Sequence, residues 1–183
     1  MNNGLNAPVE LSTHRLLLRK PRLEDAAQLF HAYASDRDIV RFVSWQAHVT
    51  EDETLDFLRH CLGEWSNGTG YPYVIETGDE PAGPVGMIHL HKRPHRVEFG
   101  YVIARPYWGQ GYMTEALSTL VDWSLAQPQI WRASAFCDID NLASARVMEK
   151  AGMIFEGILR RFFVHPNISG EPRDCRMYAK VRS

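Results

Sequence analysis

A strand, a turn with two glycines, a helix and a second strand follow one another without a linker over residues 97–137. Residues 97–104 and 131–137 are apolar segments of strand length. Between them, residues 112–126 place one set of side chains on a single helix face: Met113, Leu117, Leu120, Val121 and Ser124. Two strands joined through a helix lie parallel in one sheet, with a right-handed crossover. The chain is therefore predicted to contain a parallel strand–helix–strand unit.

Further strands are predicted around this unit, in apolar segments at residues 15–20, 73–77, 85–91, 154–164 and 173–181. Helical spacing of apolar side chains predicts helices over 24–33, from residue 50 to about 65, and over 141–151. Thr50 and Glu53 form the T-x-x-E pattern of a capping box. We expect an α/β fold with a mixed sheet, in which hairpin-like strands precede the parallel unit.

Composition limits the classes of function. The 183 residues suit one domain, so we expect a flexible N-terminus over residues 1–8 and a single domain over residues 9–183. The formal net charge of −2 disfavours a nucleic-acid binder that works mainly by charge. Since no apolar run is long enough to span a membrane and the first residues show no export signal, we expect a cytoplasmic protein.

Cysteine and histidine residues give little sign of a metal site. Cys61, Cys137 and Cys175 are far apart, which favours reduced thiols, and Cys137 is interpreted as a buried small side chain rather than a nucleophile. His89 and His91 alternate onto one strand face, with His95 beyond them. No cysteine or paired carboxylate motif accompanies these histidines, so we predict exposed strand histidines and no metal.

The turn between the first strand of the unit and its helix is the strongest candidate for a binding site. Gly109 and Gly111 permit positive φ, so successive N–H groups can point into one concavity beside the positive end of the helix. Such a concavity suits a phosphate or pyrophosphate group. A Walker loop is excluded because no Lys-Ser or Lys-Thr pair follows, and a dinucleotide fingerprint is excluded because Thr114 replaces the third glycine.

Two ordered motifs carry a resemblance to a known family. The segment 108–113, Trp-Gly-Gln-Gly-Tyr-Met, resembles the acyl-CoA-binding motif of the GNAT superfamily of N-acetyltransferases. Its first and last residues, Trp108 and Met113, depart from the general pattern. The segment 141–157 resembles the N-x-x-S…E-K-x-G-F…E-G signature of the RimJ/RimL-like ribosomal-protein N-terminal acetyltransferases, with Met153 where Phe is usual. The resemblance covers roughly residues 11–181.

The resemblance implies a GNAT acyl-CoA N-acyltransferase fold, with a mixed, mostly antiparallel sheet. Its central parallel strands, which hold Val102 and Ala135, would splay to admit acetyl-CoA as co-substrate. The Val102 N–H would then stabilise the oxyanion, and the backbone of Ile103 and Ala104 would pair with the pantetheine arm. The implied coenzyme-binding set is completed by Trp108, Gly109, Gln110, Gly111, Tyr112, Met113, Thr114, Asn141, Ser144 and Arg146.

Direct attack on a thioester requires an amine that has lost its proton. Glu98 matches the general-base position of several family members, and by alternation it shares a strand face with Gly100 and Val102. The alternative is a carboxylate that only orders nearby polar groups. Gly100, inside an apolar strand, suggests a bulge or a close approach of backbone.

The leaving thiolate requires a proton. Many relatives supply it from a Tyr at the position that Met148 occupies here, so the resemblance favours Ser144, with helix capping as its alternative role. Asn141 would bond the pantetheine or else cap the helix. An acceptor pocket could be shaped by a set of aromatic side chains that would otherwise be core: Trp45, Trp65, Tyr71 and Tyr73.

These observations predict an N-acetyltransferase that moves acetyl from acetyl-CoA to a primary amine. The branch resemblance favours a protein N-terminal α-amine. The alternatives are a small amine such as an amino acid, polyamine or antibiotic, a non-catalytic acyl-CoA sensor, and a phosphate-binding regulatory module. Family members often form dimers, and the sequence leaves a homodimer open; we expect no nucleic acid or membrane partner.

Overall fold

The computed structural model describes residues 5–78 and 83–182. Over these residues the chain forms an eight-stranded sheet in the order β1-β2-β3-β4-β5-β6-β8-β7. The strands are β1 (Glu10–Ser12), β2 (Leu16–Arg19), β3 (Gly70–Thr77), β4 (Gly83–Lys92), β5 (Arg96–Ile103), β6 (Arg132–Asp138), β7 (Ile154–Phe163) and β8 (Arg173–Val181). Only β5 and β6 are parallel, and the other described neighbours are antiparallel. The mixed, mostly antiparallel sheet is confirmed.

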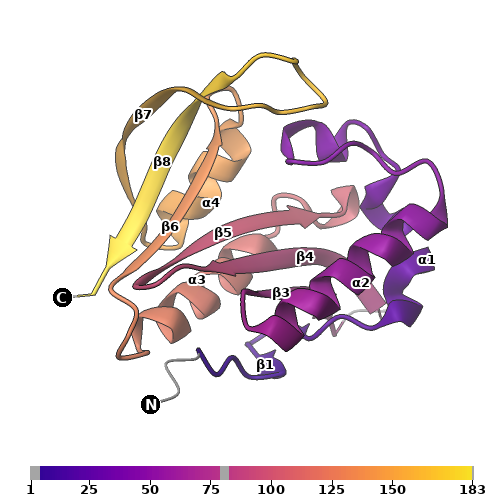
Figure 1. Cartoon of the computed structure of the whole chain (residues 1–183), viewed down its shortest axis with the longest axis horizontal. Coiled ribbons are helices and arrows are strands. Elements are labelled where there is room, and N and C mark those ends of the chain that lie inside the picture. Colours follow the sequence, from indigo (N-terminus) through magenta and orange to yellow (C-terminus); the bar gives the residue numbers. More distant parts are fainter. Residues whose placement is uncertain (1–4, 79–82, 183) are drawn as a thin grey trace.

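Helices cover both faces of this sheet (Figure 1). They are α1 (Ala26–Leu29), α2 (Glu51–Asn67), α3 (Tyr112–Leu125) and α4 (Leu142–Lys150), with shorter helical turns η1 (Leu23–Asp25), η2 (Phe30–Ala34), η3 (Ile39–Phe42) and η4 (Arg105–Tyr107). α1 and α2 pack on one face and α3 and α4 on the other, as the two buried clusters show. None of the helices in the described part of the chain has the length and apolar character needed to cross a membrane.

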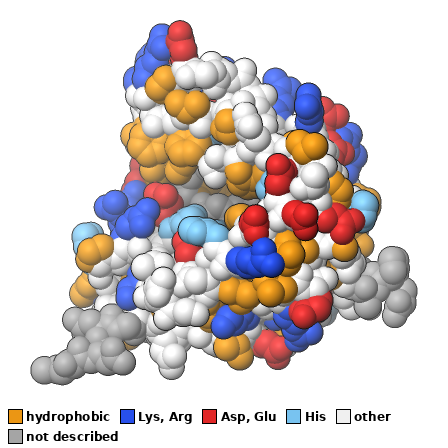
Figure 2. All heavy atoms as spheres, turned by 45° about the vertical axis from the view of Figure 1, so that its right-hand side comes forward, with side chains coloured by type: hydrophobic (Ala, Val, Ile, Leu, Met, Phe, Trp, Pro, Cys, Tyr) orange, Lys and Arg blue, Asp and Glu red, His pale blue; other side chains and the backbone are white. Residues whose placement is uncertain are grey.

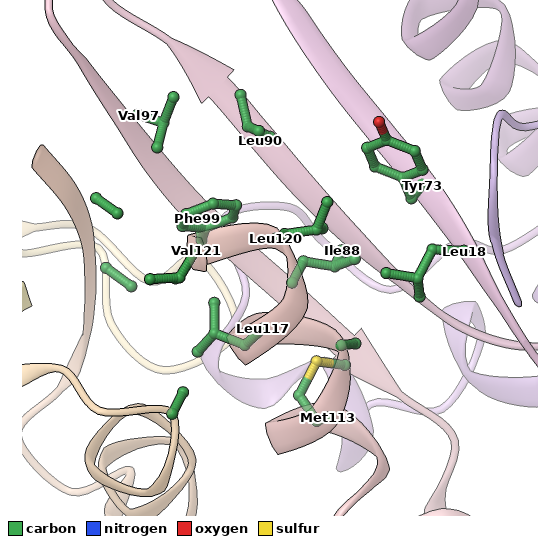
Figure 3. Close-up of a cluster of buried hydrophobic side chains, with 14 of the residues drawn as sticks. Leu18, Tyr73, Ile88, Leu90, Val97, Phe99, Met113, Leu117, Leu120 and Val121 are labelled. Carbon is green, nitrogen blue, oxygen red and sulfur yellow. The ribbon is translucent and has the colours of Figure 1, made fainter. Parts of the chain in front are cut away.

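The main core lies between the sheet and α3. Figure 3 shows Leu117, Leu120 and Val121 turned toward Ile88 and Phe99 of the sheet. These side chains are at most 3% exposed. A smaller cluster lies on the opposite face, where α1 and α2 meet β3 and β4. The helix face predicted from the spacing of Met113, Leu117, Leu120, Val121 and Ser124 is therefore the buried face of α3.

The two parallel strands separate at their C-terminal ends. β5 and β6 pair only from Arg96 with Arg132 to Phe99 with Ala135. Beyond this point β5 stays paired with β4, and β6 stays paired with β8. A gap therefore opens in the middle of the sheet, as expected for strands that splay.

Three local expectations need correction. Thr50 precedes α2 but its side chain makes no capping bond, and the Glu53 carboxylate accepts from the Val49 N–H at 2.6 Å. Gly100 lies in an unbroken register with His89, so it forms no bulge. A Cβ at Gly100 would meet no heavy atom within 4 Å, so no backbone approaches it closely either.

The start of the chain is better fixed than its composition indicated. We expected a flexible segment over residues 1–8, of which 1–4 lie outside the described residues. Leu5 is 3% exposed and belongs to the main core, and its carbonyl accepts a hydrogen bond from the Tyr71 hydroxyl. The Tyr73 hydroxyl donates to Pro8 O at 2.8 Å. Residues 5–8 are thus held by burial and by two tyrosines of β3.

Candidate functional site

The glycine turn after β5 has the predicted backbone geometry. Gly109 and Gly111 have φ values of 73° and 82°, in the left-handed region that glycine adopts without strain. Gly111 is the N-cap of α3, and the Glu115 N–H donates to its carbonyl at 3.0 Å. The N–H groups of Met113 and Thr114 precede that bond and have no intrahelical acceptor. The turn can therefore receive an anion at the positive end of α3.

Arg15, in the bend just before β2, contacts this turn although the two are distant in sequence. Its Nε lies 2.7 Å from Glu115 Oε2, and its Nη1 donates to Gln110 O at 2.9 Å. The Thr13 hydroxyl donates to Glu115 Oε1 at 2.6 Å. Although partial burial alone would raise the pKa of Glu115, the bonds from Thr13 and Arg15 hold it below its usual range. The positions of Thr13, Arg15 and Glu115 along the chain did not predict these contacts.

The side chains of the turn mainly pack against, or form hydrogen bonds with, other parts of the protein, and they offer less to a ligand. Tyr112 and Met113 are buried in the main core, so only their backbone faces the concavity. Trp108 is 48% exposed, and its indole Nε1 donates to Ile103 O at 2.7 Å. The Gln110 amide donates to Pro106 O within the turn, and Arg146 is exposed on α4.

The expected oxyanion role of the Val102 N–H does not fit the register. Val102 pairs with Met87, and two residues later the Ala104 N–H donates to Val85 O at 2.8 Å. N–H groups two residues apart in a strand point to the same side. The Val102 N–H therefore lies in the ladder between β4 and β5 and faces away from the gap. Its side chain lines the cavity described below.

The same alternation turns the N–H groups of Tyr101 and Ile103 toward the gap, beyond the last residue of β5 that pairs with β6. Ala104 is less suited than expected to hold pantetheine. Its N–H is used in the ladder, and its carbonyl accepts from the Tyr107 N–H at 3.0 Å. Alternation in the printed sequence could have assigned these directions, had the pairing partner of each strand been known.

Two hydroxyl groups meet beside the gap. The Tyr101 and Ser144 hydroxyls lie 2.8 Å apart, and burial raises the pKa of Tyr101 well above its usual value. Asn141 caps α4, since its Oδ1 accepts from the Ser144 N–H at 3.1 Å. Met148 is fully buried, and its thioether has no proton to donate. Sequence reasoning missed Tyr101, whose signal is a hydroxyl next to the gap-lining glycine.

A cavity of about 500 Å³ opens at the gap on the side of α2. Figure 2 shows a hollow near the centre of the view, with histidine side chains along its lower rim and hydrophobic side chains above it. One wall is polar: His60, Glu64, His89, His91, Arg93 and Glu98. The other is aromatic: Tyr33, Phe42, Trp45, Phe57, Phe136 and Phe163. The cavity also reaches Tyr101, Cys137, Asn141 and Ser144.

The unbroken register with β4 puts Glu98, Gly100 and Val102 on one strand face, and all three line this cavity. Glu98 forms no hydrogen bond or ion pair with another described residue. It lies directly across from His91 in the pairing of β4 with β5. A free carboxylate therefore stands where β5 begins to leave β6.

We expected the histidines of β4 to be exposed, and this expectation is wrong. The rings of His89 and His91 stack with centroids 3.9 Å apart and face the cavity, while His95 is exposed beyond them. Burial, together with the neighbouring His91 and His60, lowers the pKa of His89 to about 3, so this imidazole is neutral. His89 Nε2 lies 2.8 Å from Glu64 Oε2 on α2.

Of the aromatic residues proposed for an acceptor pocket, only Trp45 lines the cavity. Tyr71 and Tyr73 each pack edge to face on Trp65 instead. The Asn167 amide, in the connection from β7 to β8, donates to Trp45 O and Val40 O at 2.7 Å each. This connection therefore fixes one rim of the cavity. Cys137 is buried with its pKa raised to about 12 by burial, as expected for an inert thiol.

Comparison with known proteins places these features in context. A family model described as an acetyltransferase (GNAT) domain matches residues 15–154. The chain is 27% identical over 174 residues to an uncharacterized N-acetyltransferase of Bacillus subtilis, YoaA, covering 94% of this chain and 96% of that protein.

Solved structures give the same picture. A GNAT-family acetyltransferase from Bacillus anthracis superposes with a TM-score of 0.80 and 29% identity, over 94% of this chain and 98% of the other. RimL, a ribosomal L7/L12 alpha-N-protein acetyltransferase in complex with coenzyme A, gives 0.81 and 22%, over 96% and 97% of the two chains. The second likeness concerns the fold alone.

Proposed function

The chain belongs to the GNAT family of acetyltransferases and is an acetyl-CoA-dependent N-acetyltransferase, and we propose that its acceptor is the α-amine of a protein or peptide N-terminus. One observation carries the proposal. The free carboxylate of Glu98 lies in the polar wall of an open cavity, next to the point where the two parallel strands separate. A chain end that enters this cavity brings its amine to the carboxylate and to the gap together.

Acetyl-CoA would bind with its pyrophosphate on the glycine turn and its pantetheine arm in the gap. Anion binding at the turn is favoured by the N–H groups before Glu115 and by the dipole of α3. The gap-facing N–H groups of Tyr101 and Ile103 would then replace Val102 and Ala104 as partners of the pantetheine and thioester.

In the reaction, Glu98 would take the proton from the acceptor ammonium, directly or through one water. The free amine nitrogen would attack the thioester carbonyl carbon, forming a C–N bond as the carbonyl oxygen becomes an oxyanion. The Tyr101 N–H would stabilise this oxyanion. When the C–S bond breaks, the thiolate would take a proton from the paired hydroxyls of Tyr101 and Ser144.

An N-terminal α-amine suits a single carboxylate base. Its ordinary pKa of about 7.7–8.0 is far below that of a lysine side chain, so less free energy is needed to remove its proton. The aromatic wall and the rim fixed by Asn167 give apolar surface for the first side chains of a peptide. The resemblance of residues 141–157 to RimJ/RimL-like enzymes supports the same acceptor.

Release of free thiol from acetyl-CoA tests the proposal, with peptides of varied N-terminal residue, free amino acids, polyamines and aminoglycosides as acceptors. We expect turnover with peptides and none after α-amine blocking of the same peptide. Turnover confined to small amines would overturn the acceptor class but not the family. CoA binding by calorimetry with no turnover for any acceptor would favour a non-catalytic acyl-CoA sensor.

A further inference from the structure

The polar wall of the cavity contains a side-chain cluster that the acetyl transfer does not use. Glu64 of α2 and His89 and His91 of β4 bring their ligand atoms within 4.8 Å of one another. The spacing of its residues along one strand and one helix brings the cluster together. His89 and His91 are two residues apart on a strand, so they share a face. His60 and Glu64 are four residues apart on a helix, so they are neighbours as well.

Two atoms of this cluster are buried without a hydrogen-bond partner. They are Glu64 Oε2 and His89 Nε2, which lie 2.8 Å apart with an orientation that makes no hydrogen bond among the described residues. Buried polar atoms are normally satisfied, and an unpaired one costs about 1–3 kcal/mol. A bound cation would satisfy a carboxylate oxygen and an imidazole nitrogen at once.

Gly70, where β3 begins beside this cluster, keeps the space clear. A Cβ at this residue would stand 2.9 Å from Glu64 Oε1 and 3.1 Å from His89 Nε2. Any other side chain would push the carboxylate and the imidazole from their places. The absence of a Cβ at Gly70 therefore leaves room for both side chains.

We propose that Glu64, His89 and His91 bind a divalent transition-metal ion, with Zn²⁺ as the best match. Two imidazoles and one carboxylate form a donor set that suits Zn²⁺, whereas Mg²⁺ and Ca²⁺ favour sites made of oxygen ligands. A fourth ligand is available from His60, whose exposed Nε2 lies 3.7 Å from Glu64 Oε2, or from water in the cavity. Our sequence-based expectation of no metal rested on histidines without a carboxylate, and the fold supplies that carboxylate.

The cluster lies away from the glycine turn that we propose to bind the pyrophosphate of the coenzyme. It lies on the acceptor side of β4, and the glycine turn follows the far end of β5. His91 is the cross-strand neighbour of Glu98, so a bound ion would place positive charge at the acceptor end of the cavity. Metal binding should therefore leave CoA affinity unchanged, and this binding test does not depend on the acceptor proposed above.

Calorimetric titration of chelator-treated full-length protein with ZnCl₂ tests the proposal. We expect one equivalent to bind with a micromolar or lower Kd. His89→Ala and His91→Ala should each weaken binding at least tenfold, and His95→Ala, on the exposed turn after β4, serves as the matched control. Gly70→Ala should weaken binding with all ligands still present, since the new Cβ would displace two of them.

X-ray absorption at the zinc edge, on the wild-type protein, keeps the proposal falsifiable if a variant fails to fold. We expect two imidazoles and oxygen in the coordination shell. No binding at millimolar ZnCl₂, a shell without two imidazoles, or unchanged affinity in folded His89→Ala and His91→Ala would each overturn the site.

Discussion

The two faces of β5 differ in what they touch. Val97 and Phe99 point into the main core and are at most 3% exposed. Glu98, Gly100 and Val102, the residues between and after them, lie on the other face and line a cavity that Phe99 and Tyr101 also reach. One strand therefore has a filled face and a hollow face. Packing fixes the strand from one side, so the other side is free to carry an unpaired carboxylate next to the gap.

We expect the filled face of β5 to determine stability and the hollow face to determine activity. Leu117→Ala tests the filled face. Leu117 is fully buried beneath β5, so losing its side chain should cost about 3 kcal/mol of unfolding free energy. Gly100→Ala is the matched change on the hollow face and should cost less than about 1 kcal/mol, since its Cβ meets nothing. Urea unfolding followed by circular dichroism measures both. Equal losses would show that the cavity is not a free space.

On the hollow face, Glu98→Gln should have the largest effect on activity. The amide keeps the shape but cannot accept the proton, so kcat should fall by about 100-fold. The affinity for CoA should not change, because Glu98 is remote from the glycine turn along β5. Glu24→Gln, at an exposed glutamate of η1, is the control for charge. Wild-type kcat in Glu98→Gln would exclude Glu98 as the base.

Tyr101 and Ser144 test where the hollow face meets the gap. Tyr101→Phe and Ser144→Ala should each lower kcat by about tenfold, since each removes one member of a hydrogen-bonded pair of proton donors. The double variant should be little worse than either single variant, because residues acting as one unit are not additive. Steady-state kinetics with CoA affinity measured in parallel gives the comparison. Fully additive losses would mean that the two hydroxyls act separately.

Removing the contacts of Arg15 with the glycine turn should have a smaller effect, and it should change only the affinity for CoA. Arg15→Gln removes the contacts to Glu115 and Gln110, so the turn loses its fixed shape. We expect the Kd for CoA to rise about fivefold, which corresponds to about 1 kcal/mol for the lost bonds. Arg59→Gln, in an exposed pair on α2, is the control. A fall in kcat at saturating acetyl-CoA would place Arg15 in the chemistry instead.

The smallest expected effect is a dependence of the contacts between Arg15 and Glu115 on pH. The pKa of Glu115 in the folded protein is below its ordinary value, so its stabilising contribution is complete above that ordinary value. This contribution is lost as the pH falls through the lowered pKa. Glu115→Gln should therefore flatten the acid limb of the unfolding free energy by less than about 1 kcal/mol. Urea midpoints between pH 3 and 6 provide the measurement.

The accuracy of the sequence-based predictions also differs between the filled face and the hollow face of β5. The elements of the filled face were predicted well, because α3 repeats apolar residues at helical spacing and residues 97–104 form an apolar segment of strand length. The glycine turn was also predicted, since positive φ at Gly109 and Gly111 requires a residue type that is visible in the sequence. These features depend on local rules.

The hollow face was predicted less well, because it depends on which strands are neighbours. The direction of the Val102 N–H follows from its pairing with Met87, which spacing along the chain does not reveal. The contact of Glu64 with His89 joins a helix to a strand, and the Tyr101–Ser144 pair joins β5 to α4. Only the three-dimensional arrangement brings such residues together.

The short pairing of β5 with β6 has a mechanical consequence. Four residue pairs join strands β1–β5 to strands β6–β8, so this short ladder is the hydrogen-bonded connection between the two parts of the sheet. A pantetheine arm in the gap would take the place of the missing hydrogen-bonded strand. While it is bound, it would connect the two parts of the sheet. The stiffness of the whole sheet would then rise when acetyl-CoA enters and relax when CoA departs, once in every turnover.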